Sequence, residues 1–235
     1  MSVIEFRIRE DLYDCTPHPV PSKKMVPSWY KNMGQYIDES NNCPMHNGNS
    51  NLTMKSCIPI RDTLVSGYTM LLPADLIIEV VDGGVKVQWL DKSEEFVTSH
   101  SIDQIKGSPL EKMAKKSADV ILKINSPWRI YTKPGYSCHI TTPAYHDLPF
   151  EILPGIVDTD GIHELNFPIL WKTNEKHVLM KKGFPMVQIF PFKRESWNSK
   201  VIVQPHIEDE KRRKNFNTYV GHWYRDFVHK KKSYK

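Results

Sequence analysis

VILKI (120–124) begins a series of short apolar runs between Asp119 and Arg194. The series continues with WRIYT (128–132), YSCHITT (136–142), FEIL (150–153), ELNFPILWK (164–172), HVLM (177–180) and MVQIFPF (186–192). Each run is rich in β-branched or aromatic residues, and Gly, Pro, Asn or Asp stand between the runs, which is the pattern of short strands joined by turns. This half of the chain is therefore predicted to form an antiparallel β-barrel or sandwich.

Strand patterns also precede this stretch. VIEFRIR (3–9) alternates apolar and polar residues, as a half-buried strand does, and further runs are TMKSCIPI (53–60), GYTMLLPA (67–74), LIIEVVDG (76–83) and VKVQWL (85–90). Asp82-Gly83-Gly84 lies between the last two runs and favours a hairpin turn. The fold class that we predict is mainly β.

Other segments depart from the strand pattern. Prolines between residues 16 and 27 exclude regular structure there, and residues 38–53 are rich in Asn and Ser, as exposed loops are. Short helices are predicted over PSWYKNM (27–33) and PLEKMAKKSAD (109–119), and the apolar residues from Asp209 onward recur at helical spacing. We accordingly divide the chain into an irregular N-terminal segment with one strand (1–53), a β domain (54–205) and a basic C-terminal helix and tail (206–235).

Composition fits a globular protein. The chain has 235 residues, of which 40% are hydrophobic, and its net charge is +5. No apolar run approaches the roughly 18–20 residues that cross a bilayer, and charges occupy the N-terminus where a signal peptide is apolar. A soluble protein made in the cytosol, with no membrane partner, is expected. Four cysteines are too few for a disulfide scaffold, so reduced thiols are expected.

Two later segments resemble a known family. GIVDTD (155–160), followed by KGFPMVQI (182–189), resembles the G-V-I-D-x-D-Y and G-D-R-I-A-Q-L segments of dUTPases, at nearly the same spacing and with paired strands between them. The resemblance implies a trimer of dUTPase-like barrels. It also implies that Asp158 orients a water for attack on a phosphate, with Asp160 as the second acid and Mg²⁺ shielding the phosphate charge.

The sequence departs from that family where its chemistry lies. Gly161 stands in place of the sugar-reading Tyr, and Ala144-Tyr145 follow Pro143 in place of Arg-Ser. The Gly-rich C-terminal arm has no counterpart, and neither does the catalytic Glu of the related dCTP deaminases. The chain is also similar to an uncharacterised bacteriophage protein family, through segments such as NSPWRIYTKPGYS and LPFEILPGIVDTD.

These observations predict a phage-encoded accessory protein with a catalytically degenerate barrel that binds a nucleotide, a host protein or a virion component. Ligand contacts are expected at Tyr145, His146, His163 and Gln188. A metal-dependent nucleotide or phosphate hydrolase that uses Asp158 is one alternative, and a structural virion protein is another. Asp158 and Asp160 also have a purely structural interpretation, because aspartate in a tight turn accepts hydrogen bonds from nearby backbone amides.

A metal site is a further hypothesis. Cys15-Thr-Pro-His18 and Cys43-Pro-Met-His46 are two Cys-x-x-His pairs, and two such pairs supply the four ligands of a tetrahedral zinc site. The alternative is a set of thiols without a metal, accompanied by surface histidines. The basic residues of the C-terminus either contact phosphates or form a solvated helix face.

Overall fold

The computed structural model describes residues 4–37, 52–81, 84–89, 96–114, 120–173, 175–218 (only the backbone for 215–218) and 223–235. The chain forms two compact units. The first, which we call the β unit, comprises Met1–Met25 and Gly67–Arg194. The second, which we call the helical unit, comprises Val26–Ser66 and Glu195–Lys235. The predicted division at residues 53 and 205 stays a prediction.

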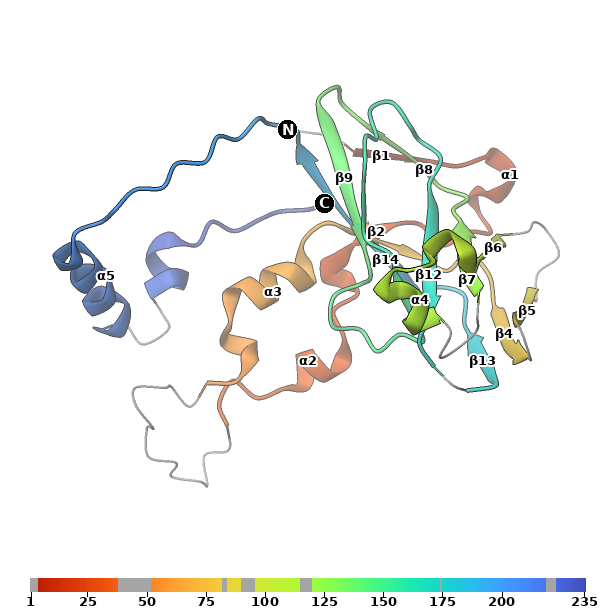
Figure 1. The fold of residues 1–235 in the computed structure, drawn as a ribbon, viewed down its shortest axis with the longest axis horizontal. Helices are drawn as coiled ribbons and strands as arrows, with labels where there is room; N and C mark the ends of the chain where they lie inside the picture. The colour runs from red at the N-terminus through yellow and green to blue at the C-terminus, as the bar shows by residue number, and fades with distance from the viewer. Residues whose placement is uncertain are drawn as a thin grey trace. The chain divides into compact units, whose positions relative to one another are not determined.

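The described residues of the β unit form four antiparallel sheets (Figure 1). The five-stranded sheet has the order β11 (Gly155–Val157), β9 (Tyr136–Thr141), β14 (Pro185–Lys193), β3 (Tyr68–Leu71) and β2 (Val20–Pro21). The four-stranded sheet has the order β10 (Phe150–Ile152), β12 (Asn166–Trp171), β7 (Val120–Asn125) and β6 (Val97–Ser101). β13 (His177–Met180), β4 (Leu76–Val81) and β5 (Gly84–Trp89) form the third sheet, and β1 (Ile4–Arg7) and β8 (Arg129–Thr132) form the fourth.

The mainly β, antiparallel architecture confirms the predicted fold class at that level. The strands of the described residues stay in separate sheets and do not form a closed barrel. The apolar runs from 120 to 192 form strands as predicted, and β4 pairs with β5 as the predicted hairpin. β6 is a strand that the sequence pattern did not indicate. The prediction that prolines exclude regular structure between residues 16 and 27 is wrong, because β2 pairs with β3 and Ser22–Lys24 form a 3-10 helix (η1).

The core of the β unit lies among these sheets. Alternate positions of the strands point inward, so that Ile124 on β7 and Phe167 and Trp171 on β12 are almost completely buried. β12 and β7 pair with Phe167 opposite Ile124, which places both side chains in one layer. Burial of such side chains stabilises the unit by about 1.5–3 kcal/mol each. The same sheets fix the position of the turn that follows β11.

The prediction of a strand over TMKSCIPI (53–60) is wrong. Met54–Ser56 form a 3-10 helix (η2), and Ile58–Val65 form an α-helix (α3). The hydroxyl of Thr53 accepts a hydrogen bond from the amide of Lys55, which caps η2. Pro59 lies in the first turn of α3, where its missing N–H costs nothing and its fixed φ favours a helix. Local capping and proline therefore outweigh the β-branched residues of this run.

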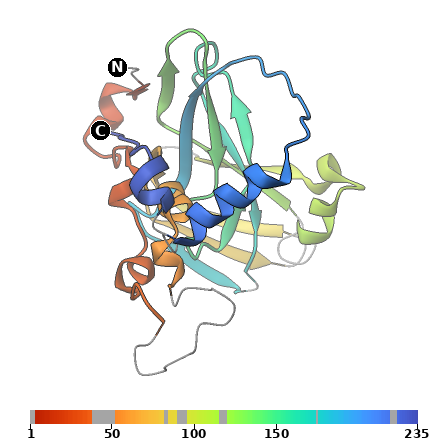
Figure 2. The same ribbon diagram turned by 90° about the vertical axis from the view of Figure 1, so that its left-hand side faces the viewer.

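The remaining helices are short apart from α5. α2 (Ser28–Asn32), α5 (His206–Thr218) and a π-helical turn, η4 (Tyr224–Val228), belong to the helical unit (Figure 2). The β unit contains α1 (Glu10–Tyr13), η1 (Ser22–Lys24), η3 (Ile102–Ile105) and α4 (Pro109–Ala114). α2, α4 and α5 lie where helices were predicted, although residues 115–119 and 219–222 are outside the described residues. Within those residues, no helix is both long and apolar enough to cross a membrane.

Candidate functional site: the acid turn

The acid turn, residues 158–161, follows β11 directly. β11 is the edge strand of the five-stranded sheet and pairs with β9, with Val157 opposite Cys138, so the turn begins at the edge of that sheet. The carbonyl of Asp158 accepts hydrogen bonds from the amides of Gly161 at 2.9 Å and Ile162 at 3.0 Å, which closes the chain back on itself. The two carboxylates of the turn are thus carried on a short backbone loop at the end of a strand.

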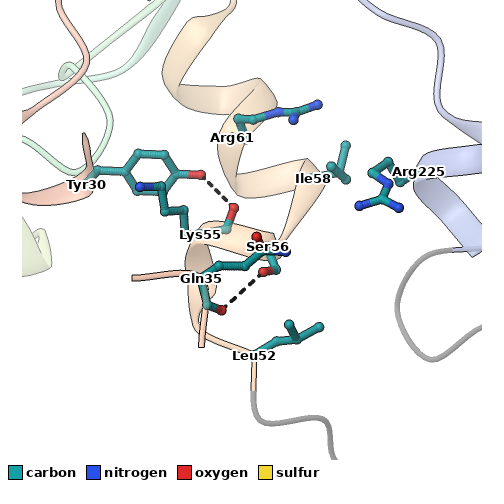
Figure 3. Close-up of a pocket in the computed structure, with 8 residues that line it drawn as sticks. All are labelled: Tyr30, Gln35, Leu52, Lys55, Ser56, Ile58, Arg61 and Arg225. Carbon is teal, nitrogen blue, oxygen red and sulfur yellow. Dashed lines mark hydrogen bonds between the residues drawn. The ribbon is translucent and has the colours of Figure 1, made fainter. Parts of the chain in front are cut away.

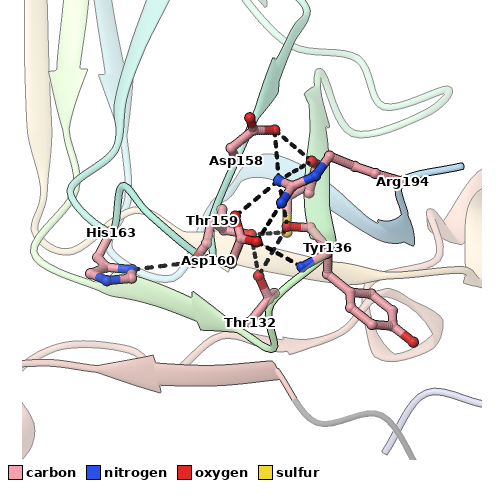
Figure 4. A network of polar contacts seen from close by, with 10 residues as sticks. Thr132, Tyr136, Asp158, Thr159, Asp160, His163 and Arg194 are labelled. Carbon is pink, nitrogen blue, oxygen red and sulfur yellow. Dashed lines mark hydrogen bonds and ion pairs between the residues drawn. The ribbon is translucent and has the colours of Figure 1, made fainter.

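Arg194 binds both carboxylates (Figure 4). It is the residue after β14, and its backbone amide donates to the carbonyl of Gly135 at 2.8 Å. Its Nη1 lies 2.9 Å from Oδ1 of Asp160 and 3.0 Å from Oδ1 of Asp158, and its Nη2 pairs with Oδ2 of Asp160. The guanidinium therefore forms a two-pronged pair with Asp160 and a further ion pair with Asp158, an arrangement for which the planar fork of arginine is suited. We call these three residues the clasp.

Neighbouring groups complete the partners of the clasp. The hydroxyl of Ser137 donates to Oδ1 of Asp158 at 2.6 Å, and the amide of Gly135 donates to Oδ2 of Asp160 at 2.8 Å. Arg194 Nη1 also donates to the hydroxyl of Ser137 at 3.1 Å. Both acids thus accept bonds from the hairpin that leads into β9, as well as from Arg194.

These contacts lower the pKa of both carboxyl groups. The pKa of Asp158 lies below its ordinary value because of the hydrogen bond from Ser137 and then because of Arg194. The pKa of Asp160 is lowered first by Arg194 and then by the amide of Gly135. A carboxylate with a lowered pKa is a weaker base, whereas a general base works best with a pKa near the operating pH. The electrostatics of the turn therefore favour a charged, bound carboxylate over proton abstraction.

The side chain of Thr159 connects the acid turn to two neighbouring strands. Its side chain is fully buried, and its hydroxyl lies 2.8 Å from that of Thr132 on β8 and 3.3 Å from Sγ of Cys138 on β9. The amide of Thr132 donates to the carbonyl of Thr159 at 3.2 Å. Through Thr159 and Arg194, the turn therefore contacts β8, β9 and the residue after β14, in addition to following β11.

Three of the four expected ligand residues, Tyr145, His146 and Gln188, lie around a different turn. The buried side chain of Gln188 on β14 accepts a hydrogen bond from the amide of Ala144 at 2.9 Å. Tyr145 follows with φ of +59°, a conformation rare for a residue other than glycine. His146 comes next, and burial lowers its pKa. Gln188 therefore positions the turn that carries Tyr145 and His146.

His163 is stacked flat on Tyr131, with ring centroids 3.7 Å apart. Its Nδ1 lies 3.1 Å from the carbonyl of Ile130 and 3.2 Å from that of Thr159. The guanidinium of Arg7 lies over the ring of Tyr131, 4.0 Å from its centroid. His163 thus contacts the backbone of the acid turn, while the carboxylates of that turn are bound by Arg194.

The first Cys-x-x-His pair lies in the β unit. Sγ of Cys15 is 3.4 Å from the carbonyl of Leu12, and Nε2 of His18 is 3.2 Å from the carbonyl of Tyr13. Cys43 and His46 fall outside the described residues, so the zinc hypothesis stays a prediction. Among the residues that the structure describes, no group of three or more His, Cys, Asp or Glu side chains is arranged to hold a metal ion.

Sequence reasoning missed Arg194 and Ser137. The resemblance to dUTPases pointed at the acids and carried no position for their partners. The signal that would have found them is strand register: β14 pairs with β9 so that Phe192 lies opposite Ser137 and Lys193 opposite Tyr136. That register brings the residue after Lys193 to the hairpin beside the acid turn.

Comparison with known proteins gives distant similarities. No family model matches the chain, and no curated protein matches it. The native dUTPase of EIAV is 13% identical, with a TM-score of 0.32, over 58% of this chain and 87% of that one. A mutant dUTPase from phage phi11 of S. aureus, described as coordinating a structural Mg(II) ion, is 9% identical, with a TM-score of 0.35, over 86% of this chain and 97% of that one. Similarities at this level assign neither an activity nor a site to the chain.

Proposed function

We propose that the protein acts by binding rather than by turnover, and that its acid turn is a structural clasp instead of a hydrolytic centre. The observation that carries the proposal is the pairing of Arg194 with both Asp158 and Asp160. In the hydrolase that the sequence resembles, the matching carboxylate is available to orient a water. Here the equivalent carboxylate is engaged by a guanidinium and a hydroxyl, and its pKa is lowered.

The lack of unshared carboxylate charge for a metal ion supports the same conclusion. A divalent cation that binds phosphate oxygens needs carboxylates with unshared negative charge. Asp160 gives both of its oxygens to Arg194, and one of them also accepts from Gly135. A Mg²⁺ ion could bind the two carboxylates only by displacing the guanidinium of Arg194, which would break its ion pairs with Asp158 and Asp160. This loss disfavours a Mg²⁺ site at the turn.

The partner class that we propose is a nucleotide, in a phage-encoded accessory protein that assembles as a homo-oligomer. Support comes from the resemblance of GIVDTD (155–160) and KGFPMVQI (182–189) to dUTPase segments. A host protein or a virion component is the partner if nucleotides do not bind. Mass spectrometry of purified particles identifies a virion component directly.

Turnover is tested by incubating the purified protein with a panel of nucleoside triphosphates and diphosphates plus Mg²⁺, and measuring release of phosphate and pyrophosphate. The expected result is release no faster than in a protein-free control. Asp158→Asn is measured beside Asp14→Asn, a matched control because Asp14 is exposed. Release by the wild-type protein and by Asp14→Asn, but not by Asp158→Asn, would establish the hydrolase alternative and end the proposal.

Binding is tested separately by the thermal midpoint in the presence of millimolar nucleotides, with and without Mg²⁺. A ligand that binds the folded protein raises the midpoint, because it stabilises the native state by mass action. We expect a rise that does not require Mg²⁺. An unchanged midpoint with every nucleotide would exclude the nucleotide as partner.

A further inference from the structure

A cavity of about 380 Å³ lies within the helical unit (Figure 3). Its volume is within the range of about 300–1,000 Å³ that is typical of small-molecule sites. The walls combine three apolar or aromatic side chains with three cationic ones, namely Tyr30, Leu52 and Ile58 with Lys55, Arg61 and Arg225. Among the residues described here, no aspartate or glutamate lines this cavity. A concave site that combines apolar side chains with several cationic ones is suited to an anionic ligand.

Arg61 supplies the least compensated charge. It lies in α3, and within the described part of the chain its guanidinium makes neither a hydrogen bond nor an ion pair. The next residue, Asp62, does not neutralise it, because the Asp62 carboxylate is bound by His229 at 3.0 Å and by Lys232. The carboxylate of Asp62, the acid next to Arg61 in α3, is thus already bound. None of the described residues accepts a hydrogen bond from the five N–H donors of Arg61, so these donors are available to a ligand.

Lys55 and Arg225 add to this charge. Nζ of Lys55 donates to the carbonyls of Lys31 and Met33, both at 2.7 Å, so its position is fixed, and no carboxylate of the described residues pairs with its charge. Arg225 uses Nε and one Nη to bind Asp226, at 2.7 and 3.2 Å. Its other Nη takes no part in that pair. The cavity therefore presents more than one positive charge and a guanidinium with unused donors.

Tyr30 and Ile58 supply the apolar part of the cavity wall. Tyr30 is 5% exposed, and its hydroxyl donates to the carbonyl of Lys55 at 3.3 Å, which holds the ring in place. Ile58 begins α3 and is equally buried. Figure 3 shows Ile58 between the two arginines and Tyr30 on the other side of Lys55. A ligand with an aromatic or aliphatic body can thus contact apolar surface while its anionic group reaches the arginines.

We propose that this cavity binds a small organic phosphate, with the phosphate held by Arg61 and Arg225 and the organic part against Tyr30 and Ile58. A phosphate is favoured over a monovalent anion because it carries up to two charges and offers several acceptor oxygens to two guanidinium groups. The site lies in the helical unit and uses no residue of the acid turn. A nucleotide is itself an organic phosphate, so the inference rests on the nucleotide partner proposed above and names a place where its phosphate is held.

The test is isothermal titration of the full-length protein with phenyl phosphate, inorganic phosphate and benzoate. Phenyl phosphate is expected to bind most tightly, because it alone combines the dianion with an aromatic ring. Arg61→Gln should weaken its binding by about tenfold or more, the range expected for charge-assisted hydrogen bonds. Arg225→Gln, at an exposed position that does not support the fold, should weaken it in the same direction.

Arg212→Gln is the matched control, because it removes the same charge from an exposed position of α5. It should bind phenyl phosphate as the wild-type protein does. Absence of binding at millimolar phenyl phosphate, or unchanged affinity in both pocket variants, would overturn the inference, and equal affinity for benzoate would overturn the assignment to phosphate. A nucleotide that raises the thermal midpoint while phenyl phosphate fails to bind would contradict this site alone, and binding of phenyl phosphate without a rise from any nucleotide would contradict the nucleotide partner alone.

Discussion

At the scale of single residues, the contacts of Arg194 distinguish a structural role of the acid turn from a chemical one. A pair of aspartates two residues apart at the end of a strand is compatible with either chemistry or structure. The difference lies in their partners: the side chain of Asp160 is 13% exposed and is paired with Arg194 through both oxygens, whereas that of Asp158 is 64% exposed and is bound by Ser137 and Arg194 through Oδ1 alone. The more buried acid is the more fully bound one, as expected when removing a carboxylate from water requires compensation.

The depressed pKa values predict a loss of stability in acid. A carboxyl group whose pKa is lower in the folded state than in the unfolded state contributes stability that is fully present above the unfolded pKa, about 3.9 for aspartate. That contribution is lost as the pH falls through the folded pKa. Asp158 and Asp160 are both of this kind. The thermal midpoint of the wild-type protein should therefore drop as the pH falls below about 4.

Comparison with Asp160→Asn isolates the contribution of the clasp from that of other acids. The variant should be less stable than the wild-type protein at neutral pH, and the gap between the two should narrow as the pH falls below about 4. Asp14→Asn serves as the control at an exposed position. A gap that stays constant from neutral pH into acid would show that Asp160 gains nothing from being ionised in the folded protein.

Strands were the part of the fold that the sequence predicted best at the scale of elements. Runs such as VILKI (120–124) and FEIL (150–153) are short, apolar and bounded by turn residues, so their patterns indicate strands rather than helices. The run over residues 53–60 was mispredicted because its helical signals, the cap at Thr53 for η2 and the early Pro59 for α3, lie among β-branched residues. The partners of the acid turn could not be predicted, because they depend on the register between β9 and β14, which is a long-range property.

A substitution at Gly67, immediately before β3, tests how closely the backbone there approaches β14. Its φ is +76°, and a Cβ at this position would lie 2.1 Å from the carbonyl oxygen of Ile189 on β14. Gly67→Ala should therefore cost more than the about 1–2 kcal/mol of the left-handed conformation alone. Gly183 is the matched control, because its φ is +83° and a Cβ there meets nothing within 4 Å.

The measurement is chemical denaturation of both alanine variants. Gly183→Ala should lose about 1–2 kcal/mol, from the backbone conformation alone. Gly67→Ala should lose clearly more, because the clash is with backbone that also pairs in the sheet. Equal losses would mean that β3 and β14 separate enough to accept a methyl group at no cost.

The molecule as a whole combines a β unit with a large apolar core and a helical unit that contains a cationic cavity. The two candidate roles are divided in the same way: the clasp belongs to the β unit and the proposed phosphate site to the helical unit. Sequence patterns indicated the first unit much better than the second. The helical unit is assembled from two stretches that are far apart along the chain, so its cavity has no continuous motif.

Core packing predicts which substitutions destabilise the folded protein. Phe167 on β12 is 1% exposed within the core of the β unit, so Phe167→Ala should lower the free energy of unfolding by about 3–5 kcal/mol. Trp197, which is 86% exposed, offers a contrasting control, and Trp197→Ala should change it by no more than about 0.5 kcal/mol. Denaturant unfolding followed by circular dichroism measures both. Comparable effects would contradict the assignment of the core.

The central claim, that Arg194 and the acid turn form a structural clasp, is tested most directly by a double-mutant cycle. The free energy of unfolding is measured for the wild-type protein, Arg194→Gln, Asp160→Asn and the double variant. Because the two side chains contact each other, the loss in the double variant should be smaller than the sum of the losses in the single variants. Strictly additive losses, or single variants as stable as the wild-type protein, would contradict the claim.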